Sequence, residues 1–198
     1  MQENELIKVY DEMFNLISTE RRSVVHKNGL LHQVVHLWIY ETINDEKWLY
    51  FIQRAQDLPE FPGLYDLPAS GHIDPEGTFS QAVVAAAATQ LGLELIPENL
   101  NHIGNIRQLM DKGDYHDNAF CQVYMKKVLD PVFTAKHVAR VIRVKAKDYA
   151  AWVKNPEKPL TIYTTEGEVI GETTADDWWW PRQKEFEKVV KPYLDNVQ

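Results

Sequence analysis

The chain has 198 residues, 44% of them apolar and 25% charged, which is the usual balance of a globular protein that buries a substantial core. Its formal net charge of −8 argues against a basic surface for nucleic acid, so we expect no nucleic-acid partner. The N-terminal residues are polar, no apolar run approaches the roughly 20 residues of a membrane span, and Cys121 is the one cysteine. These features predict a cytoplasmic protein without a membrane partner.

The first part of the chain predicts two hairpins and an ordered loop. Residues 6–22 alternate between apolar and polar side chains, with a turn at 11–15, which indicates a short hairpin. Residues 32–42 and 47–55 are rich in β-branched and aromatic residues and have a polar connection between them, which indicates a second hairpin. Residues 58–70 contain three prolines and a glycine, and this composition favours an ordered loop over a helix.

Residues 78–91 are predicted to form a long helix. Thr78 and Gln81 have the spacing of a capping box, the alanines that follow favour helix, and Gly92 suits the position just after a helix end. The apolar spacing predicts that one face of this helix packs on the sheet through Phe79, Val83, Ala87 and Leu91.

The second half of the chain predicts further strands and two helices. Residues 102–110 and 119–128 read as an antiparallel pair of strands, and residues 138–146 as another strand. Residues 147–153 predict a short helix, and residues 181–197 a final amphipathic helix with its proline near the start. Strands with one long helix in the middle and one at the end indicate a mixed α/β sandwich.

Three stretches of the chain carry a resemblance to a known family: LHQVVHLWIY, FIQRAQDLPEFPGLYDLPASGHI, and the turn-helix-glycine frame that runs from Gly71 to Leu93. They resemble the Nudix family, in the branch similar to isopentenyl-diphosphate isomerase, over about residues 31–146. The resemblance implies an α/β (α+β) fold, a Nudix-type α/β/α sandwich with a mixed sheet. Residues 1–198 would then be a single domain, with an N-terminal hairpin at 1–30 and a C-terminal appendage with a terminal helix at about 147–198.

The chain departs from the family's signature at every charged position. That signature is G-x5-E-x7-R-E-U-x-E-E-x-G-U, where U is aliphatic, and Gly71, Gly92 and Leu93 match its frame. Its charged positions fall on Gly77, Ala85, Ala86, Thr89 and Gln90. The turn DPEGT offers one residual acid, Glu76, which is either displaced from the first glutamate position or a solvated turn residue.

The resemblance implies a Mg²⁺ or Mn²⁺ cofactor, and the missing acids would be its ligands. Positions 86, 89 and 90 share one helical face, and in the family that face points carboxylates at Mg²⁺ or Mn²⁺. Alanine offers no ligand atom, and the neutral oxygens of threonine and glutamine are poor magnesium ligands. We therefore expect that the metal ligands are missing here and that magnesium-dependent pyrophosphohydrolase activity is lost.

The histidines of the chain offer the ligands for a different metal site. The resemblance places the isomerase's metal histidines close to His26, His32 and His72, although the first spacing is one residue short. Imidazole nitrogen suits divalent transition metals. Against an isomerase, its catalytic cysteine position reads Ser70, and its later glutamate pair falls near Asp117 and Ala119. The alternative is a set of partly buried or surface histidines in a ligand cleft.

Four other features have both a functional and a structural interpretation. Arg54 would bind a phosphate with its planar guanidinium or be a surface arginine at a strand end. His116 and Asp117 would line a site or form a solvated turn, and Cys121 would be a nucleophile or a core residue. The tryptophans of residues 176–181 would stack a ring or cover the core, and we favour the core because neighbouring side chains do not face one way.

Three functions compete on these residues. We expect a protein related to nucleoside- or isoprenoid-diphosphate hydrolases whose activity is lost and which binds a phosphorylated small molecule. The alternatives are an active hydrolase with an atypical site, and an isomerase-like enzyme with a histidine-based metal site. The expected ligand-binding residues are Arg54, Ser70, His72 and Asp117. A homodimer is left open as the assembly.

Overall fold

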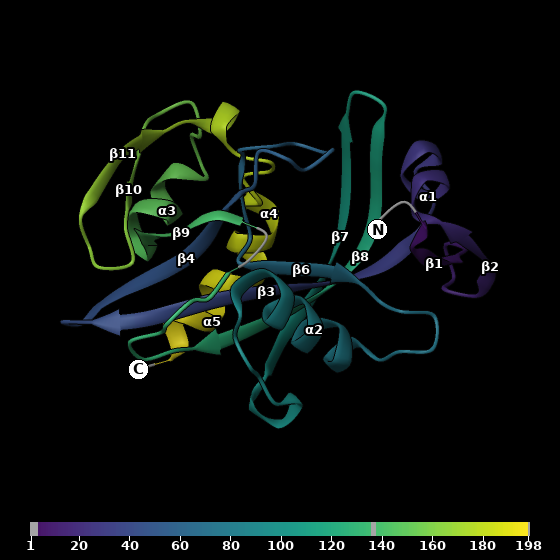
Figure 1. Ribbon diagram of the computed structural model, residues 1–198, viewed down its shortest axis with the longest axis horizontal. Coiled ribbons are helices and arrows are strands. Elements are labelled where there is room, and N and C mark those ends of the chain that lie inside the picture. Colours follow the sequence, from purple (N-terminus) through teal and green to yellow (C-terminus); the bar gives the residue numbers. More distant parts are fainter. Residues whose placement is uncertain (1–3, 136–137, 198) are drawn as a thin grey trace.

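The computed structural model describes residues 4–135 and 138–197, which form one branched sheet with helices on both sides (Figure 1). The strands are β1 (Leu6–Tyr10), β2 (Leu16–Arg21), β3 (His32–Ile43), β4 (Glu46–Arg54), β5 (Tyr65–Asp66), β6 (Ala69–His72), β7 (Asn101–Lys112), β8 (Tyr115–Lys127), β9 (Val138–Lys145), β10 (Leu160–Tyr163) and β11 (Val169–Thr173). The helices are α1 (Arg22–Asn28), α2 (Phe79–Leu91), α3 (Ala146–Trp152), α4 (Gln183–Glu185) and α5 (Lys191–Asn196), with the π-helical segment η4 (Phe186–Val190) between the last two and short 3-10 turns η2 (Pro97–Asn99) and η3 (Ala175–Asp177).

The sheet branches because β3 and β4 stay paired only near their connecting turn. The pairs run from Tyr40 to Ile43 on β3. Beyond them β3 pairs with β6 and, in parallel, with β8, whereas β4 pairs with β5 and β9. The two strands therefore separate, and the side chains that point into this opening come from both branches. The parallel β3–β8 pair makes the sheet mixed, as predicted.

The long helix α2 confirms the sequence prediction. The Thr78 hydroxyl accepts the backbone N–H of Gln81 at 3.3 Å, and the Gln81 side chain accepts the N–H of Thr78 at 2.9 Å. Gly92 ends the helix with φ 67°, in the left-handed region that glycine adopts without strain. Val83, Ala87 and Leu91 are fully buried, and Phe79 is partly buried against the same cluster.

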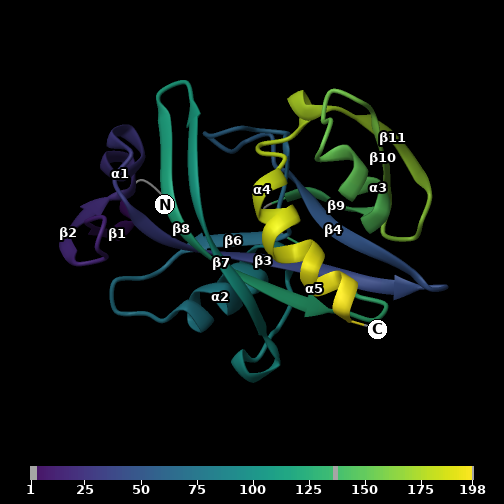
Figure 2. The same cartoon turned by 180° about the vertical axis from the view of Figure 1, so that it is seen from behind.

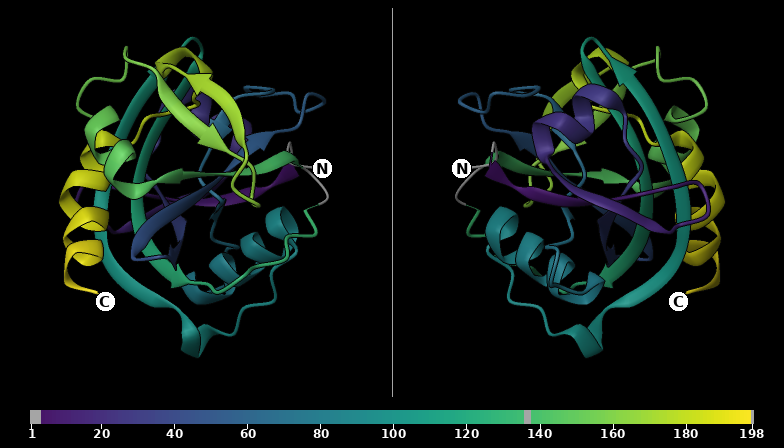
Figure 3. Two further views of the ribbon diagram at one scale, coloured as in Figure 1. Left: turned by 90° about the vertical axis from the view of Figure 1, so that its left-hand side faces the viewer. Right: turned by 90° about the vertical axis from the view of Figure 1, so that its right-hand side faces the viewer.

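The C-terminal helices cover the sheet face opposite α2. Figure 2 shows them from behind, and the side views in Figure 3 place the strands between them and α2. Phe186 packs in the core with Trp38, Tyr149 and Trp178. Trp178 is buried in this core, as predicted, whereas Trp179 is buried against Phe61 and also lines the cleft. In the described residues, no helix combines the length and apolarity required to cross a membrane.

Four local features differ from the sequence prediction. The helix α1 follows the predicted N-terminal hairpin, and strands β10 and β11 lie in a stretch for which no element was predicted. The final helix begins at Gln183, after Arg182 at φ 54°, and its middle turn is π-helical rather than regular α-helix. Asp117 lies within β8 and is buried, so the prediction of a solvated turn at this residue is wrong.

Candidate functional site

A cleft of about 1030 Å³ opens where β3 and β4 separate. Val34 and His36 of β3 line it, as do Ile52 and Arg54 of β4. Its size is at the upper end of the range usual for small-molecule sites. The branching of the sheet thus provides the space, and the elements around it determine the chemistry.

Two sets of side chains border the cleft and differ in chemistry. The first, the helix wall, comes from α2 and consists of Ala82, Ala85, Ala86, Thr89 and Gln90. The second, the charged wall, comes from three strands and the segment before α4 and consists of His36, Gln108, Asp117 and Arg182. The positions that carry acids in the family's signature therefore face the cleft, but they are neutral here.

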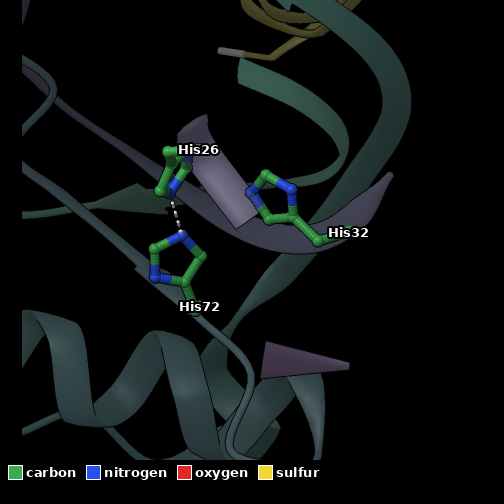
Figure 4. Close-up of side chains that lie close together, drawn as sticks. All are labelled: His26, His32 and His72. Carbon is green, nitrogen blue, oxygen red and sulfur yellow. Dashed lines mark hydrogen bonds between the residues drawn. The ribbon is translucent and has the colours of Figure 1, made fainter. Parts of the chain in front are cut away.

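Three histidines predicted as metal ligands lie together at one end of the cleft (Figure 4). One ring nitrogen from each of His26, His32 and His72 lies within 4.8 Å of the others, and His26 Nε2 is 3.1 Å from His72 Nε2. We call these residues the histidine cluster. The structure therefore brings together residues that the sequence separates by as many as 46 positions.

Local structure explains why the three rings meet. The helix α1 ends at Gly29 with φ 59°, so the chain turns back and carries His26 over the start of β3, where His32 lies. His72 arrives on β6, which pairs antiparallel with β3 so that His72 lies opposite Val34. A residue other than glycine at position 29 would strain this reversal.

Hydrogen bonds orient two of the rings. His32 Nδ1 lies 2.9 Å from the Leu30 carbonyl, and His72 Nδ1 lies 3.2 Å from Glu5 Oε1. Both contacts are made through Nδ1, so Nε2 of each ring faces the cluster, toward His26 in the case of His72 and toward Asp117 in the case of His32. Such outer hydrogen bonds are the usual means by which proteins fix metal-binding imidazoles.

Asp117 completes the surroundings of the histidine cluster. Its Oδ1 is 3.4 Å from His32 Nε2 and 3.8 Å from His26 Nδ1, and all three atoms are buried without a hydrogen-bond partner among the described residues. His32 Nε2 and Asp117 Oδ1 are both acceptors, so they cannot satisfy each other directly. Buried polar atoms without partners are rare in proteins, and a cation between them would satisfy both.

The electrostatic environment keeps two of these imidazoles neutral. Burial, followed by the neighbouring His72 and His32, lowers the pKa of His26 to about 2. Burial and His72 also lower the pKa of His32 to about 4, against the opposing effect of Asp117. The neutral ring is the form that binds metals. Three nitrogens with a nearby carboxylate fit Mn²⁺, Fe²⁺ or Zn²⁺ better than Mg²⁺, which prefers oxygen ligands.

The helix wall does not fit the magnesium site that the family resemblance implies. Ala86 is nearly buried and has no ligand atom, and Thr89 offers only a neutral hydroxyl. The Gln90 side chain donates from Nε2 to the Ser70 carbonyl at 2.7 Å, which ties α2 to β6. A Cβ on Gly71 would lie 3.6 Å from the Ala86 Cβ, so the helix sits close to β6. This face can pack and hydrogen-bond, but it does not supply carboxylates.

The remaining predicted site residues have mixed positions. Glu76 is exposed in the turn before α2 and lines the cleft. Arg54 also lines it, but Nε and Nη2 donate to the Phe61 and Glu60 carbonyls at 3.1 and 2.9 Å. The arginine therefore holds the loop between β4 and β5. Ser70 lines the cleft on β6, and Cys121 is fully buried, as the core interpretation requires.

Sequence reasoning missed part of the charged wall. His36 lies within an apolar strand, and its isolation there was the available signal. Arg182 and Glu185 follow the tryptophans near the C-terminus and carry no motif. Their position beside the cleft depends on where the final helix packs, which local sequence does not determine.

Comparisons with known proteins show what the chain resembles. No family model matches it. An uncharacterised Nudix hydrolase from Clostridium acetobutylicum is 28% identical over 123 residues, which cover 62% of this chain and 59% of that protein. The chain thus spans less than two thirds of this relative. Isopentenyl-diphosphate Delta-isomerase 1 from Photorhabdus laumondii is 26% identical over 161 residues, covering 79% of this chain and 89% of that protein.

The fold has a counterpart among solved structures. The crystal structure of a MutT/nudix family protein from Enterococcus faecalis superimposes with a TM-score of 0.56 at 13% identity, over 83% of this chain and 62% of that chain. The chain therefore has the Nudix fold and is related in sequence to proteins named Nudix hydrolases.

Proposed function

We propose that this Nudix-fold protein binds a phosphorylated small molecule in the cleft, together with a divalent transition-metal ion at the histidine cluster. We further propose that it lacks the magnesium-dependent hydrolysis expected at the helix wall. The observation that carries the proposal is the convergence of three imidazoles and Asp117, with buried acceptor atoms that face one another unpaired. A bound cation would neutralise phosphate charge at this end of the cleft.

An anionic ligand is supported by the cations that line the cleft. Arg22, Arg54 and Arg182 all border it, and arginine is well suited to phosphate because its planar guanidinium binds two oxygens. Arg22 forms a bidentate pair with Glu60, in the loop between β4 and β5, at 2.7 and 2.6 Å. A phosphate that reached Arg22 would compete with this carboxylate, so the loop and the ligand share one cation.

The second candidate is an enzyme similar to isopentenyl-diphosphate isomerase. The histidine cluster and the relative of that name favour it. Two positions oppose it, because Ser70 stands where the isomerase has its cysteine, and Ala119 is a buried residue where an acid is expected. A serine hydroxyl is a much weaker acid than a thiol. We therefore rank metal-assisted binding above isomerisation.

The test compares the metal dependence of stability in designed variants. Metal-stripped protein is melted with Mn²⁺, Zn²⁺ or Mg²⁺. At 100-fold the dissociation constant, a bound ion adds about 2.7 kcal/mol of stability, or about 5 to 10 °C in midpoint. We expect this rise with Mn²⁺ or Zn²⁺ and not with Mg²⁺. His32→Ala and His72→Ala should each abolish it.

A matched control uses a histidine outside the cleft. His102 hydrogen-bonds to Asn105 at 2.9 Å on the surface, and His102→Ala should keep the full response to Mn²⁺. Pyrophosphate binding, measured by calorimetry, should be tighter with Mn²⁺ in the parent and His102→Ala proteins only. A Mg²⁺-dependent rise of similar size, or a Mn²⁺ response that survives His72→Ala, would contradict the proposal.

A further inference from the structure

The base of the cleft holds a buried polar group that the metal proposal does not use. His36, Arg182 and Glu185 are each at most 4% exposed, and His36 and Arg182 line the cleft. His36 comes from β3, whereas the other two come from the C-terminal segment. Placing an imidazole, a guanidinium and a carboxylate together in the interior is costly unless each is paired.

Glu185 is fully engaged. Its Oε2 accepts from His36 Nδ1 at 2.8 Å, and its Oε1 accepts from Trp38 Nε1 at 2.7 Å. Burial raises the pKa of Glu185, but His36, Arg182 and Trp38 outweigh burial and leave the pKa below its ordinary value. The carboxylate therefore orients the His36 ring through Nδ1, and Nε2 lies on the other side of the ring, toward Arg182.

Arg182, which contacts His36 Nε2, keeps one N–H donor without a partner. Its Nη2 donates to Asp66 Oδ1 at 3.0 Å and its Nη1 to Gln108 Oε1 at 2.9 Å, but Nε is buried without a partner among the described residues. The contact from Nη1 to His36 Nε2 is long, at 3.4 Å. The backbone of Arg182 has φ 54°. Residues other than glycine adopt this conformation at a cost in free energy, and it is often found at functional sites.

The formal charges of the arginines and carboxylates in this group balance one another. Arg182 and Arg54 flank Asp66, at 3.0 and 3.5 Å, and Arg182 lies 3.9 Å from Glu185. Two cations face two anions, so an added anion would be uncompensated unless the group also gained a positive charge. Besides Arg182 and Glu185, the titratable or charged side chains near His36 are Arg54, Asp66, Cys121 and Tyr149.

We propose that His36 Nε2 and the free N–H of Arg182 form a seat for one phosphoryl group of the ligand, and that His36 takes up a proton from solvent as that group binds. The inference rests on the proposed function and adds a recognition site that needs no metal. Gln108 connects the two sites, because its Nε2 donates to Asp117 while its Oε1 accepts from Arg182. The ligand's phosphoryl end would therefore lie along the charged wall, and the helix wall would contact its neutral part.

Ring protonation tests the seat directly. Sulfate is the first probe because it is a tetrahedral oxyanion that does not titrate near neutral pH. The protonation midpoint of His36, followed through its ring ¹⁵N chemical shifts in EDTA, should rise by about one pH unit when sulfate saturates the protein. His36→Gln identifies the signals by removing them, and Arg182→Lys should abolish the sulfate-dependent shift.

Affinity provides the second readout. In EDTA at pH 7, pyrophosphate should bind about tenfold or more weakly to His36→Gln and to Arg182→Lys than to the parent, because each loses a charge-assisted hydrogen bond. Arg107→Lys is the matched control, since Arg107 pairs with Glu12 and Asn118 outside the cleft. Melting curves check that each variant is folded. If Arg182→Lys does not fold, His36→Gln carries the test, because the glutamine still offers an N–H donor to Glu185.

The outcomes separate the two proposals. Parental affinity in both variants, or a His36 midpoint that sulfate does not move, would overturn the seat. If pyrophosphate binding requires Mn²⁺ and is lost in His72→Ala but unchanged in His36→Gln, the seat is wrong and the proposed function stands. If neither sulfate nor pyrophosphate binds with or without Mn²⁺, both are wrong.

Discussion

The two walls of the cleft differ in local structure and in charge. The helix wall keeps a capping box, a glycine end and close packing on β6, yet it carries no charged side chain. The charged wall has no recognisable motif, yet it holds Asp117 and a buried network around Arg182. Geometry and chemistry are thus separable, because α2 has the frame of the signature helix without charged side chains on the face that borders the cleft.

Removing the buried carboxylate that His36 and Arg182 of the charged wall share should have the largest effect. Glu185→Ala leaves Arg182 and His36 without their shared partner, and loss of one member of a buried ion pair costs about 3 to 5 kcal/mol. Urea unfolding measures the change in the free energy of unfolding. Glu172→Ala, at an exposed position of β11, should stay within about 0.5 kcal/mol of the parent. A loss below about 1 kcal/mol for Glu185→Ala would show that the network is not structural.

The same carboxylate predicts a pH dependence with a definite sign. Its folded-state pKa is lowered, so it stabilises the fold above the unfolded-state pKa of about 4.3. That contribution is lost as pH falls through the lower folded-state value. Stability measured between pH 5 and pH 2 should therefore decline less steeply in Glu185→Gln than in the parent. An identical slope in both proteins would contradict this assignment.

Introducing acids on the helix wall would give both walls charged side chains. The changes are Ala85→Arg, Ala86→Glu, Thr89→Glu and Gln90→Glu. The three carboxylates repel one another without a cation, and the bond from Gln90 to Ser70 is lost, so the variant should be less stable than the parent in EDTA. Mg²⁺ at 100-fold its dissociation constant should return about 2.7 kcal/mol.

Calorimetric titration with Mg²⁺ provides the direct readout for this variant. A folded quadruple variant without a Mg²⁺ site would mean that the backbone of the helix wall has moved away from metal-binding geometry. The parent protein, titrated in parallel, should show no Mg²⁺ site at the helix wall.

A smaller change loosens the helix wall from the sheet. Gln90→Leu removes the side-chain hydrogen bond to the Ser70 carbonyl, which should cost about 1 kcal/mol of stability. The Mn²⁺-dependent rise in melting temperature should persist, because the histidine cluster is unchanged. Loss of the Mn²⁺ response in this variant would show that the two regions are coupled.

The smallest effect is expected at the centre of the former signature. Thr89 is exposed on α2 and faces the cleft. Thr89→Ala should change stability by no more than about 0.5 kcal/mol and leave the affinity for Mn²⁺ unaltered by calorimetry. A marked drop in metal affinity would place the ion at the helix wall and contradict the assignment to the histidines.

The sequence predicted the helix α2, and it predicted the histidines at one end of the cleft. The capping box at Thr78 and the stop at Gly92 are local signals, so the bounds of α2 followed from them. The histidines were found because a family resemblance supplied their long-range proximity. Arg182 and Glu185 could not be found in this way, because their role depends on how the C-terminal helix packs across β3. For Asp117, an expected ligand-binding residue, only the solvated-turn alternative is wrong: its polar neighbours suggested a turn, whereas the β7–β8 hairpin continues past it.

The central claim is that metal binding belongs to the histidine cluster and not to α2. Anomalous diffraction from crystals grown with Mn²⁺ and pyrophosphate tests it most directly. The account predicts an anomalous peak among His26, His32 and His72, within reach of Asp117, with pyrophosphate density along the charged wall. A peak beside Thr89 and Gln90, or bound pyrophosphate with no peak at the histidines, would contradict it.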